Sequence, residues 1–150
     1  MRPMIPPPVF GLIAAGLLWA ADRYLPGLSV SFPGQAMVAV IVAAIGVMIE
    51  TVGIAAFVRQ KTTVNPLRPE RANSLVISGL YRYSRNPMYL GMAFLLCGWA
   101  LYLGTLSVLV IVPAFIWVLT EVQIKPEEVA LEALFGEDYR AYMQRVRRWL

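Results

Sequence analysis

The chain has 150 residues, of which 59% are hydrophobic and 15% are charged, with a formal net charge of +4. A soluble domain carries roughly 25% charged residues, so this composition predicts an all-α integral membrane protein. The chain has no histidine and one cysteine, Cys97, which excludes histidine-ligated haem, the usual zinc sites, Ser-His or Cys-His catalysis and an internal disulfide.

The first apolar stretch covers residues 6–21. About 20 apolar residues span a bilayer as a helix, because a helix satisfies its own backbone where water is absent. Arg2 and the small pair Ala20-Ala21 also fit a cleaved signal peptide loosely. The later apolar stretches would remain in the membrane after such a cleavage, so we interpret residues 6–21 as a retained transmembrane helix.

The second apolar stretch covers residues 34–58 and contains one acidic residue, Glu50. An ionisable side chain inside a membrane span is a candidate for function. Glu50 can line the route of a lipophilic substrate, or it can pair with an arginine of the loop that follows. The sequence leaves both possibilities open.

A polar loop with six basic side chains covers residues 59–86, and the chain is then uncharged from residue 86 to residue 120. This run is somewhat shorter than two full spans of about 20 residues each. The best turn is Leu103-Gly104-Thr105, so we expect a hairpin of two short helices and about four transmembrane helices in all. Asn86-Pro87 predicts the start of the hairpin, with Asn86 capping free N–H groups and Pro87 at the first helical position.

The basic residues predict the orientation of these helices. They gather in the loop 59–86 and after Glu121, whereas the connector 22–33 has one and the 103–105 turn has none. The positive-inside rule then places the loop and both termini in the cytoplasm, which fits four crossings of a bacterial inner membrane. We interpret the net charge as topology and contact with membrane lipids, and we expect no nucleic acid partner.

The segment KPEEVALEALFGEDYRAY, residues 125–142, predicts helices outside the apolar layer. Pro126 indicates a helix start, Glu127 and Glu128 suit the positive end of the helix dipole, and Gly136 can end the helix. A second, basic amphipathic helix follows and would lie on anionic lipid. Taken alone, Glu127 and Glu128 are equally explained by a capping role without any further function.

The segment GLYRYSRNPMYLG, residues 79–91, places three tyrosines and two arginines before the hairpin. Tyrosine and snorkelling arginine are ordinary at a membrane interface. Together with the later motifs, however, this segment resembles the isoprenylcysteine carboxyl methyltransferase family and its phospholipid N-methyltransferase relatives, over roughly residues 60–146. The resemblance is carried by Gly79, Tyr81, Arg85, Asn86, Pro87, Met88, Tyr89, Gly91, Glu127, Glu128, Phe135, Gly136, Tyr139 and Tyr142.

The resemblance implies a membrane methyltransferase that uses S-adenosylmethionine and releases S-adenosylhomocysteine. We expect one domain, residues 1–150, in which two N-terminal helices (1–58) precede a cofactor-binding core (59–150). Tyrosine faces attract a sulfonium and a carboxylate pairs with an ammonium. The cofactor contacts that the resemblance implies are Asn73, Ser74, Leu75, Val76, Tyr81, Asn86, Pro87, Met88, Tyr89 and Glu127.

For the methyl transfer itself we expect contributions from Arg85, Glu128 and Glu50. In-line displacement depends on alignment and water exclusion, so we expect no metal. No Gly-x-Gly-x-x-Gly turn is present, which excludes a Rossmann-type methyltransferase.

The acceptor is left open by two departures from the family pattern. Relatives that methylate a prenylcysteine carboxylate have an arginine where this chain has Gln123, and glutamine cannot neutralise a carboxylate. Asn86 stands where the family often has a histidine. We place Gln123 and Arg82 at the acceptor.

The acceptor that remains is a neutral group, a phospholipid or lipid amine, or another lipophilic carboxylate held by Arg85, Arg82 or Lys125. A small non-enzymatic protein of membrane transport or assembly is the alternative from a different class. The sequence predicts no oligomeric state.

Overall fold

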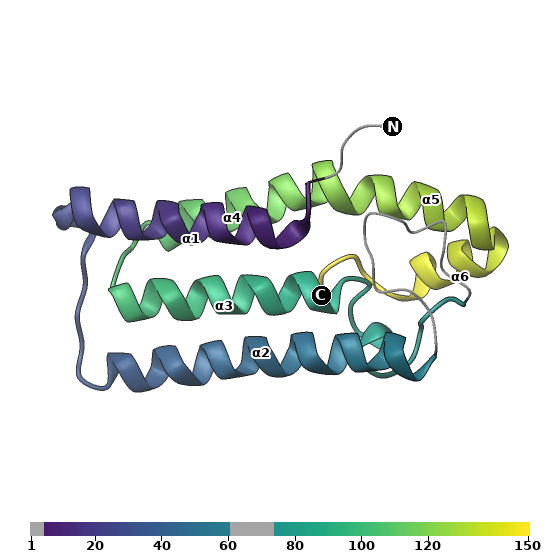
Figure 1. The fold of residues 1–150 in the computed structure, drawn as a ribbon, viewed down its shortest axis with the longest axis horizontal. Helices are drawn as coiled ribbons and strands as arrows, with labels where there is room; N and C mark the ends of the chain where they lie inside the picture. Colours follow the sequence, from purple (N-terminus) through teal and green to yellow (C-terminus); the bar gives the residue numbers. More distant parts are fainter. Residues whose placement is uncertain (1–4, 61–73) are drawn as a thin grey trace.

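The computed structural model describes residues 5–60 and 74–150, and the regular elements in those ranges are helices (Figure 1). This confirms the all-α prediction. The chain runs back and forth through the long helices, so that successive ones are antiparallel (Figure 1). They are α1 Pro7–Tyr24, α2 Gln35–Arg59, α3 Pro87–Leu103 and α4 Val108–Leu119, with the short 3-10 helix η1 Pro26–Leu28 after α1.

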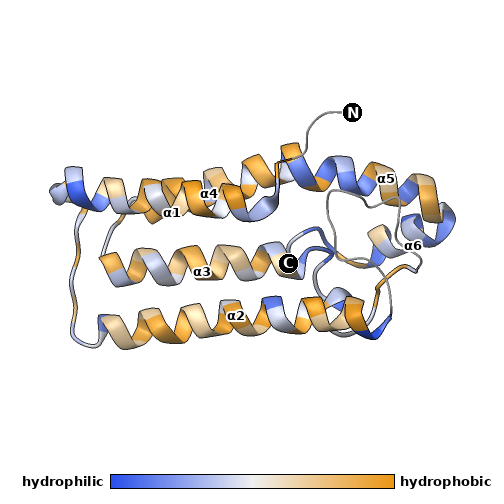
Figure 2. Ribbon diagram, viewed as in Figure 1, coloured by the Kyte–Doolittle hydropathy of each residue, from blue (hydrophilic) through white to orange (hydrophobic). Residues whose placement is uncertain are grey.

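Two helical runs are long and apolar enough to cross a bilayer, Gln35–Arg59 and Val108–Phe135, and Pro87–Leu103 is a shorter apolar helix. Apolar residues dominate α2, α3 and α4, whereas hydrophilic residues gather toward α5 and α6 (Figure 2). These features support a membrane protein. That the chain crosses the membrane four times, and with which orientation, stays a prediction.

Helix α4 does not end where charged residues return. It continues through a π-helical segment, Thr120–Ile124, into α5 Lys125–Phe135, with right-handed helical backbone at both junctions. The expectation that Pro126 opens a separate helix is therefore wrong. Proline has no N–H to donate, and the wider π turn just before it changes the hydrogen-bond register, so the helix continues past Pro126 without a break.

The ends of the other helices follow local chemistry more closely. Helix α5 stops at Gly136, which has a positive φ of 54°, and α6 Glu137–Arg145 follows. Helix α1 runs three residues beyond the predicted residue 21, because Asp22 and Arg23 form part of its last turn. A cation there is favourable at the negative end of the helix dipole.

Helix α3 is the centre of the bundle. It packs against α2 on one side and against α1 and α4 on the other. The apolar core on the α1 and α4 side includes Leu18, Leu96, Phe115 and Leu119, all buried. Helix α2 touches this core little, since its only buried residues are Ala39, Gly46 and Gly53.

A seam of small residues holds α2 against α3. A Cβ added to Gly46 would lie 2.8 Å from the carbonyl oxygen of Gly91, and one added to Gly98 would lie 2.9 Å from the backbone nitrogen of Ala43. Small residues let helix backbones approach closely inside a membrane, where lipid supplies no hydrophobic drive for association. Close backbone packing is therefore what fixes α2.

The connector between α1 and α2 is joined by hydrogen bonds to the turn between α3 and α4. Val30 N donates to Gly104 O at 2.7 Å, and Leu106 N donates to Leu28 O at 2.8 Å. Gly104 has φ 77°, and a Cβ there would collide with the carbonyl of Val30. The turn predicted at residues 103–105 is therefore confirmed, and it requires glycine.

The seam gives a testable prediction. Gly98→Ala should lower the free energy of unfolding by about 1–3 kcal/mol, because the new methyl meets backbone atoms of α2 that cannot move aside. The matched control is Gly16→Ala in α1, where a Cβ has no neighbour within 4 Å. Thermal unfolding in detergent micelles measures both, and equal midpoints for the two variants would contradict tight packing of the seam.

Candidate active site

Polar groups from distant parts of the chain meet at the end of the bundle where α5 and α6 lie (Figures 1 and 2). Tyr89 Oη in the first turn of α3 donates a hydrogen bond of 2.7 Å to Glu127 Oε1 in α5. The Gln123 amide donates to the same oxygen at 2.5 Å. Tyr89 is 6% exposed and Gln123 is fully buried, whereas Glu127 is half-buried, so the network is partly screened from bulk water.

The π-helical segment places Gln123 on the inner side of its helix. Gln123 and Ile124 are its buried residues, and Glu127 follows one turn later. Single π turns within α-helices are frequent at functional sites, because the extra residue turns the following side chains to a new face. Here Gln123 and Glu127 both turn toward Tyr89.

The 3-10 helix η3, Gly79–Arg82, brings Tyr81 to the same end. Tyr81 is 4% exposed, its ring meets Phe57 of α2 edge-on at 5.4 Å, and its carbonyl accepts a bond of 2.7 Å from Tyr142 Oη. Burial raises the pKa of Tyr81 well above its ordinary value, with smaller contributions from Tyr142 and Glu127. The Tyr81 phenol is therefore neutral and can donate a hydrogen bond.

Glu128 binds two arginines. Arg148 Nε and Nη2 donate to its two oxygens at 2.9 and 2.7 Å, and Arg85 Nη2 lies 3.2 Å from Glu128 Oε1. Neither Glu127 nor Glu128 makes a capping bond, and α5 has no free N-terminus because the helix continues from α4. The interpretation of the acidic pair as capping charges is therefore wrong.

Asn86 does not cap α3 through its side chain as predicted. Its Nδ2 donates instead to the carbonyl oxygen of Arg148 at 2.9 Å, because the end of the chain folds back beside it. Pro87 does occupy the first position of α3 and is buried.

The segment before η3 also reaches this end. Val76 is buried, and Leu75 packs against a small cluster of Tyr139, Tyr142 and Val146. The Ser74 hydroxyl is buried. Asn73, the remaining residue predicted in this segment, lies outside the described residues.

Four other residues named from the sequence lie away from the network. Met88 packs against Gly53 of α2. Glu50 lies in the α2–α3 seam against Gly91, which is two residues after Tyr89 in α3. Arg82 is exposed, and Lys125 pairs with Glu121 at 2.6 Å on the surface. The described ion pairs do not include Glu50, so its role stays a prediction.

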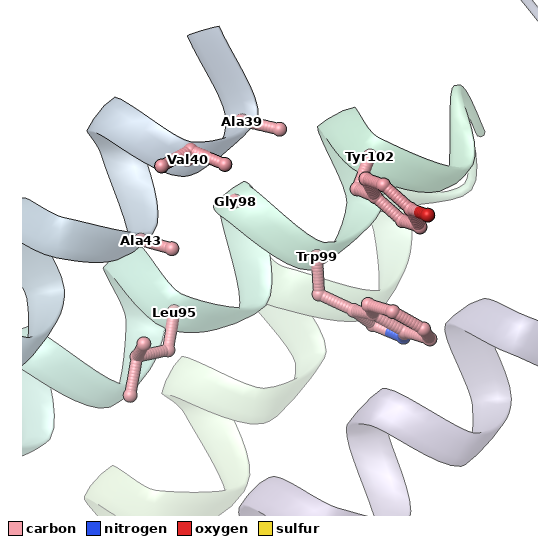
Figure 3. Close-up of a pocket in the computed structure, with 7 residues that line it drawn as sticks. All are labelled: Ala39, Val40, Ala43, Leu95, Gly98, Trp99 and Tyr102. Atoms are coloured by element: carbon pink, nitrogen blue, oxygen red, sulfur yellow. The ribbon is translucent and has the colours of Figure 1, made fainter. Parts of the chain in front are cut away.

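A shallow apolar hollow of about 320 Å³ lies elsewhere, between α2 and the later half of α3 (Figure 3). Trp99 and Tyr102 of α3 stack at 5.9 Å beside it, and Ala39, Val40 and Ala43 of α2 contribute to its lining (Figure 3). It is lined by Ala39, Val40, Ala43, Leu95, Gly98, Trp99 and Tyr102. These belong to the end of the bundle opposite Glu127, so the hollow is not part of the candidate site.

Sequence reasoning missed three residues of this end: Phe57, Arg148 and Trp149. Phe57 supports Tyr81, Arg148 binds Glu128, and Trp149 Nε1 donates to Thr120 Oγ1 at 3.1 Å. Their partners are 20 to 29 residues away along the chain or in a different helix. No spacing rule relates such positions, so the sequence carries no signal that would have found these contacts.

Comparison with known proteins gives a family. A model of the phospholipid methyltransferase family matches residues 35–138. An uncharacterized protein of Haemophilus influenzae is 46% identical over 63 residues, which make up 42% of this chain and 100% of that protein. No solved structure matches.

The bond from α6 to η3 gives a prediction. Tyr142→Phe should make release of η3 from α6 easier by about 1–3 kcal/mol, because the buried carbonyl of Tyr81 loses its partner. Trypsin cleavage after the exposed Arg82 should then be about fivefold faster or more, since cleavage follows the population of the open form. Tyr83→Phe is the control, since Tyr83 is 74% exposed. An unchanged rate in Tyr142→Phe would refute this role.

Proposed function

The chain belongs to the phospholipid methyltransferase family, and from this membership we propose that it is an S-adenosylmethionine-dependent methyltransferase with a lipophilic acceptor. One observation supports the site above all others. The Tyr89–Glu127 bond joins the tyrosine-rich segment to the acidic pair, the two regions expected to hold the cofactor. A small transport or assembly protein gives no reason for this convergence.

The donor set fits such a cofactor. Ser74 Oγ, Tyr81 Oη and two nitrogens of Arg85 are buried, and within the described residues they have no hydrogen-bond partner. Buried polar groups in proteins are nearly always bonded, so these atoms are suited to a ligand rich in polar groups. Glu127 adds a carboxylate for an ammonium, and Tyr81 and Tyr89 add faces for a sulfonium.

Bound S-adenosylmethionine supplies a methyl group on an electrophilic sulfonium. The chain's own residues would hold and orient it. Glu127 would bind the ammonium while Gln123 and Tyr89 keep its carboxylate in place. The buried surroundings of Tyr89 and Gln123 would exclude water, and alignment together with water exclusion is the main source of rate for such a transfer.

We propose that this end of the bundle lies at the cytoplasmic face of a bacterial inner membrane. The basic residues of the 59–86 loop and of the tail support this orientation through the positive-inside rule. The cofactor would then arrive from water, and the acceptor would arrive laterally from the lipid between the helices.

A phospholipid or lipid amine is the acceptor that the site favours over a prenylcysteine carboxylate. Gln123 is fully buried and its amide donates to Glu127, so it serves the acidic network and is not available to clamp a carboxylate. Glu50 lies against Gly91 in the α2–α3 seam, so we propose that it contributes to the route of the acceptor between these helices.

Cofactor binding gives the third prediction. Glu127→Gln should weaken S-adenosylhomocysteine binding by about 2 kcal/mol or more, the cost of truncating one partner of a buried charge pair. Tyr89→Phe should weaken it by about 1–3 kcal/mol through the lost hydroxyl. Calorimetry on purified protein measures both affinities.

The matched control is Glu121→Gln, an acidic residue of the same helical run whose side chain is 40% exposed and pairs with Lys125. Its affinity should equal that of the wild type. If the wild type binds no S-adenosylhomocysteine, the proposed function is wrong.

The acceptor gives the fourth prediction. Membrane lipid extract incubated with the protein and methyl-labelled cofactor should yield labelled phospholipid or lipid amine, identified by the mass of the product. The label should be stable to mild base, because an N-methyl bond survives treatment that cleaves a methyl ester. Base-labile label on a prenylated cysteine would instead identify a carboxylate acceptor.

A further inference from the structure

The last five residues, 146–150, form a C-terminal strap that lies across the candidate site. Arg85 N donates to Arg147 O at 3.0 Å, and Asn86 Nδ2 donates to Arg148 O at 2.9 Å. Trp149 Nε1 donates to Thr120 Oγ1 at 3.1 Å. The strap is therefore held by bonds that do not involve the side chain of Arg148.

The side chain of Arg148 binds Glu128 in a two-bond fork. Its Nε and Nη2 take one carboxylate oxygen each, at 2.9 and 2.7 Å. Arg85 reaches the same carboxylate by one longer contact, Nη2 to Oε1 at 3.2 Å. Arg148 is thus the main partner of Glu128.

Arg85 is left with unused donors in a buried place. Its side chain is 10% exposed, and its Nε and Nη1 are buried without a partner among the described residues. Burial raises the pKa of the neighbouring Tyr139 to about 12, with smaller effects of Glu128 and Arg85, so this phenol adds no negative charge. Within the described residues, two guanidinium groups therefore pair with one carboxylate, and a buried cation requires a further partner.

We propose that Arg148 is a positioning residue that holds both oxygens of Glu128 and thereby keeps the free Nε–H and Nη1–H donors of Arg85 available for an oxyanion of the reactants. This inference rests on the proposed function. Two reactant groups have the required chemistry, the carboxylate of the cofactor and the phosphate of a phospholipid acceptor. Either oxyanion can accept a charge-assisted bond from one of these donors.

The alternative arrangement explains why Arg148 is needed. Without its side chain, both oxygens of Glu128 are open, and Arg85 can turn to form the two-bond fork itself. An arginine prefers this fork to a single contact, so one of the two free donors would bind Glu128 beside Nη2 and be consumed within the protein. The oxyanion would then bind less tightly, although the strap itself stays in place through Asn86 and Trp149.

The test compares Arg148→Gln with Arg145→Gln. Arg145 ends α6, and within the described residues its side chain donates only to the carbonyl of Ala141, so its variant removes the same charge from the tail without touching Glu128. The double variant Arg148→Gln/Glu128→Gln removes the competing carboxylate as well. It should restore oxyanion binding, whereas a merely structural role of Arg148 predicts a further loss.

Two pairs of probes identify the oxyanion. S-Adenosylhomocysteine is compared by calorimetry with its decarboxylated analogue, S-adenosyl-3-thiopropylamine. Phosphatidylethanolamine is compared as acceptor with hexadecylamine, which has no phosphate, in the same nonionic micelles. In one of the two pairs, Arg148→Gln should weaken only the compound that has the oxyanion. The expected loss is about tenfold, in Kd for S-adenosylhomocysteine or in KM for phosphatidylethanolamine with kcat little changed, as for one lost charge-assisted bond.

Each outcome decides. A selective loss in the first pair assigns the free Arg85 donors to the cofactor carboxylate, and one in the second pair assigns them to the lipid phosphate. If the wild type binds S-adenosylhomocysteine but Arg148→Gln behaves like Arg145→Gln in both pairs, or weakens both members equally, the inference is wrong and the proposed function stands. If the wild type binds no S-adenosylhomocysteine, both fall together.

Discussion

The hydrogen bond between Tyr89 and Glu127 is the interaction on which the account of this protein depends. It joins the first turn of α3 to α5, the helix that continues from α4. Because Tyr89 and Gln123 are buried, separating them from Glu127 would leave their polar groups unpaired. The bond therefore fixes a polar cluster at one end of an apolar bundle, and this cluster is where we propose that the cofactor binds.

The apolar bundle and the end of the chain both support that site. Helix α3 carries Tyr89, and it is held by α2 through backbone packing and by α1 and α4 through large apolar side chains. At the polar end, Tyr142 donates a hydrogen bond to η3, and the strap accepts one from Asn86. The tail, which composition alone assigns to a lipid surface, thus also packs against the candidate site.

Sequence predicted those features that are set by local chemistry. Pro87 begins α3, Gly104 makes the turn and Gly136 ends α5, since each depends on the conformational range of one residue. The passage of the helix through Pro126 was not predictable, because the π turn before it depends on burial of Gln123 and Ile124 against other helices. Arg148 was missed for a related reason, as its partner Glu128 is close only in the fold.

The most direct measurement of the central claim is a double-mutant cycle on S-adenosylhomocysteine affinity with Tyr89→Phe, Glu127→Gln and their combination. If these residues hold one ligand through their mutual bond, the loss in the double variant should be smaller than the sum of the single losses by about 1 kcal/mol or more. Single losses that simply add would show that Tyr89 and Glu127 act apart, and would contradict a shared cofactor site.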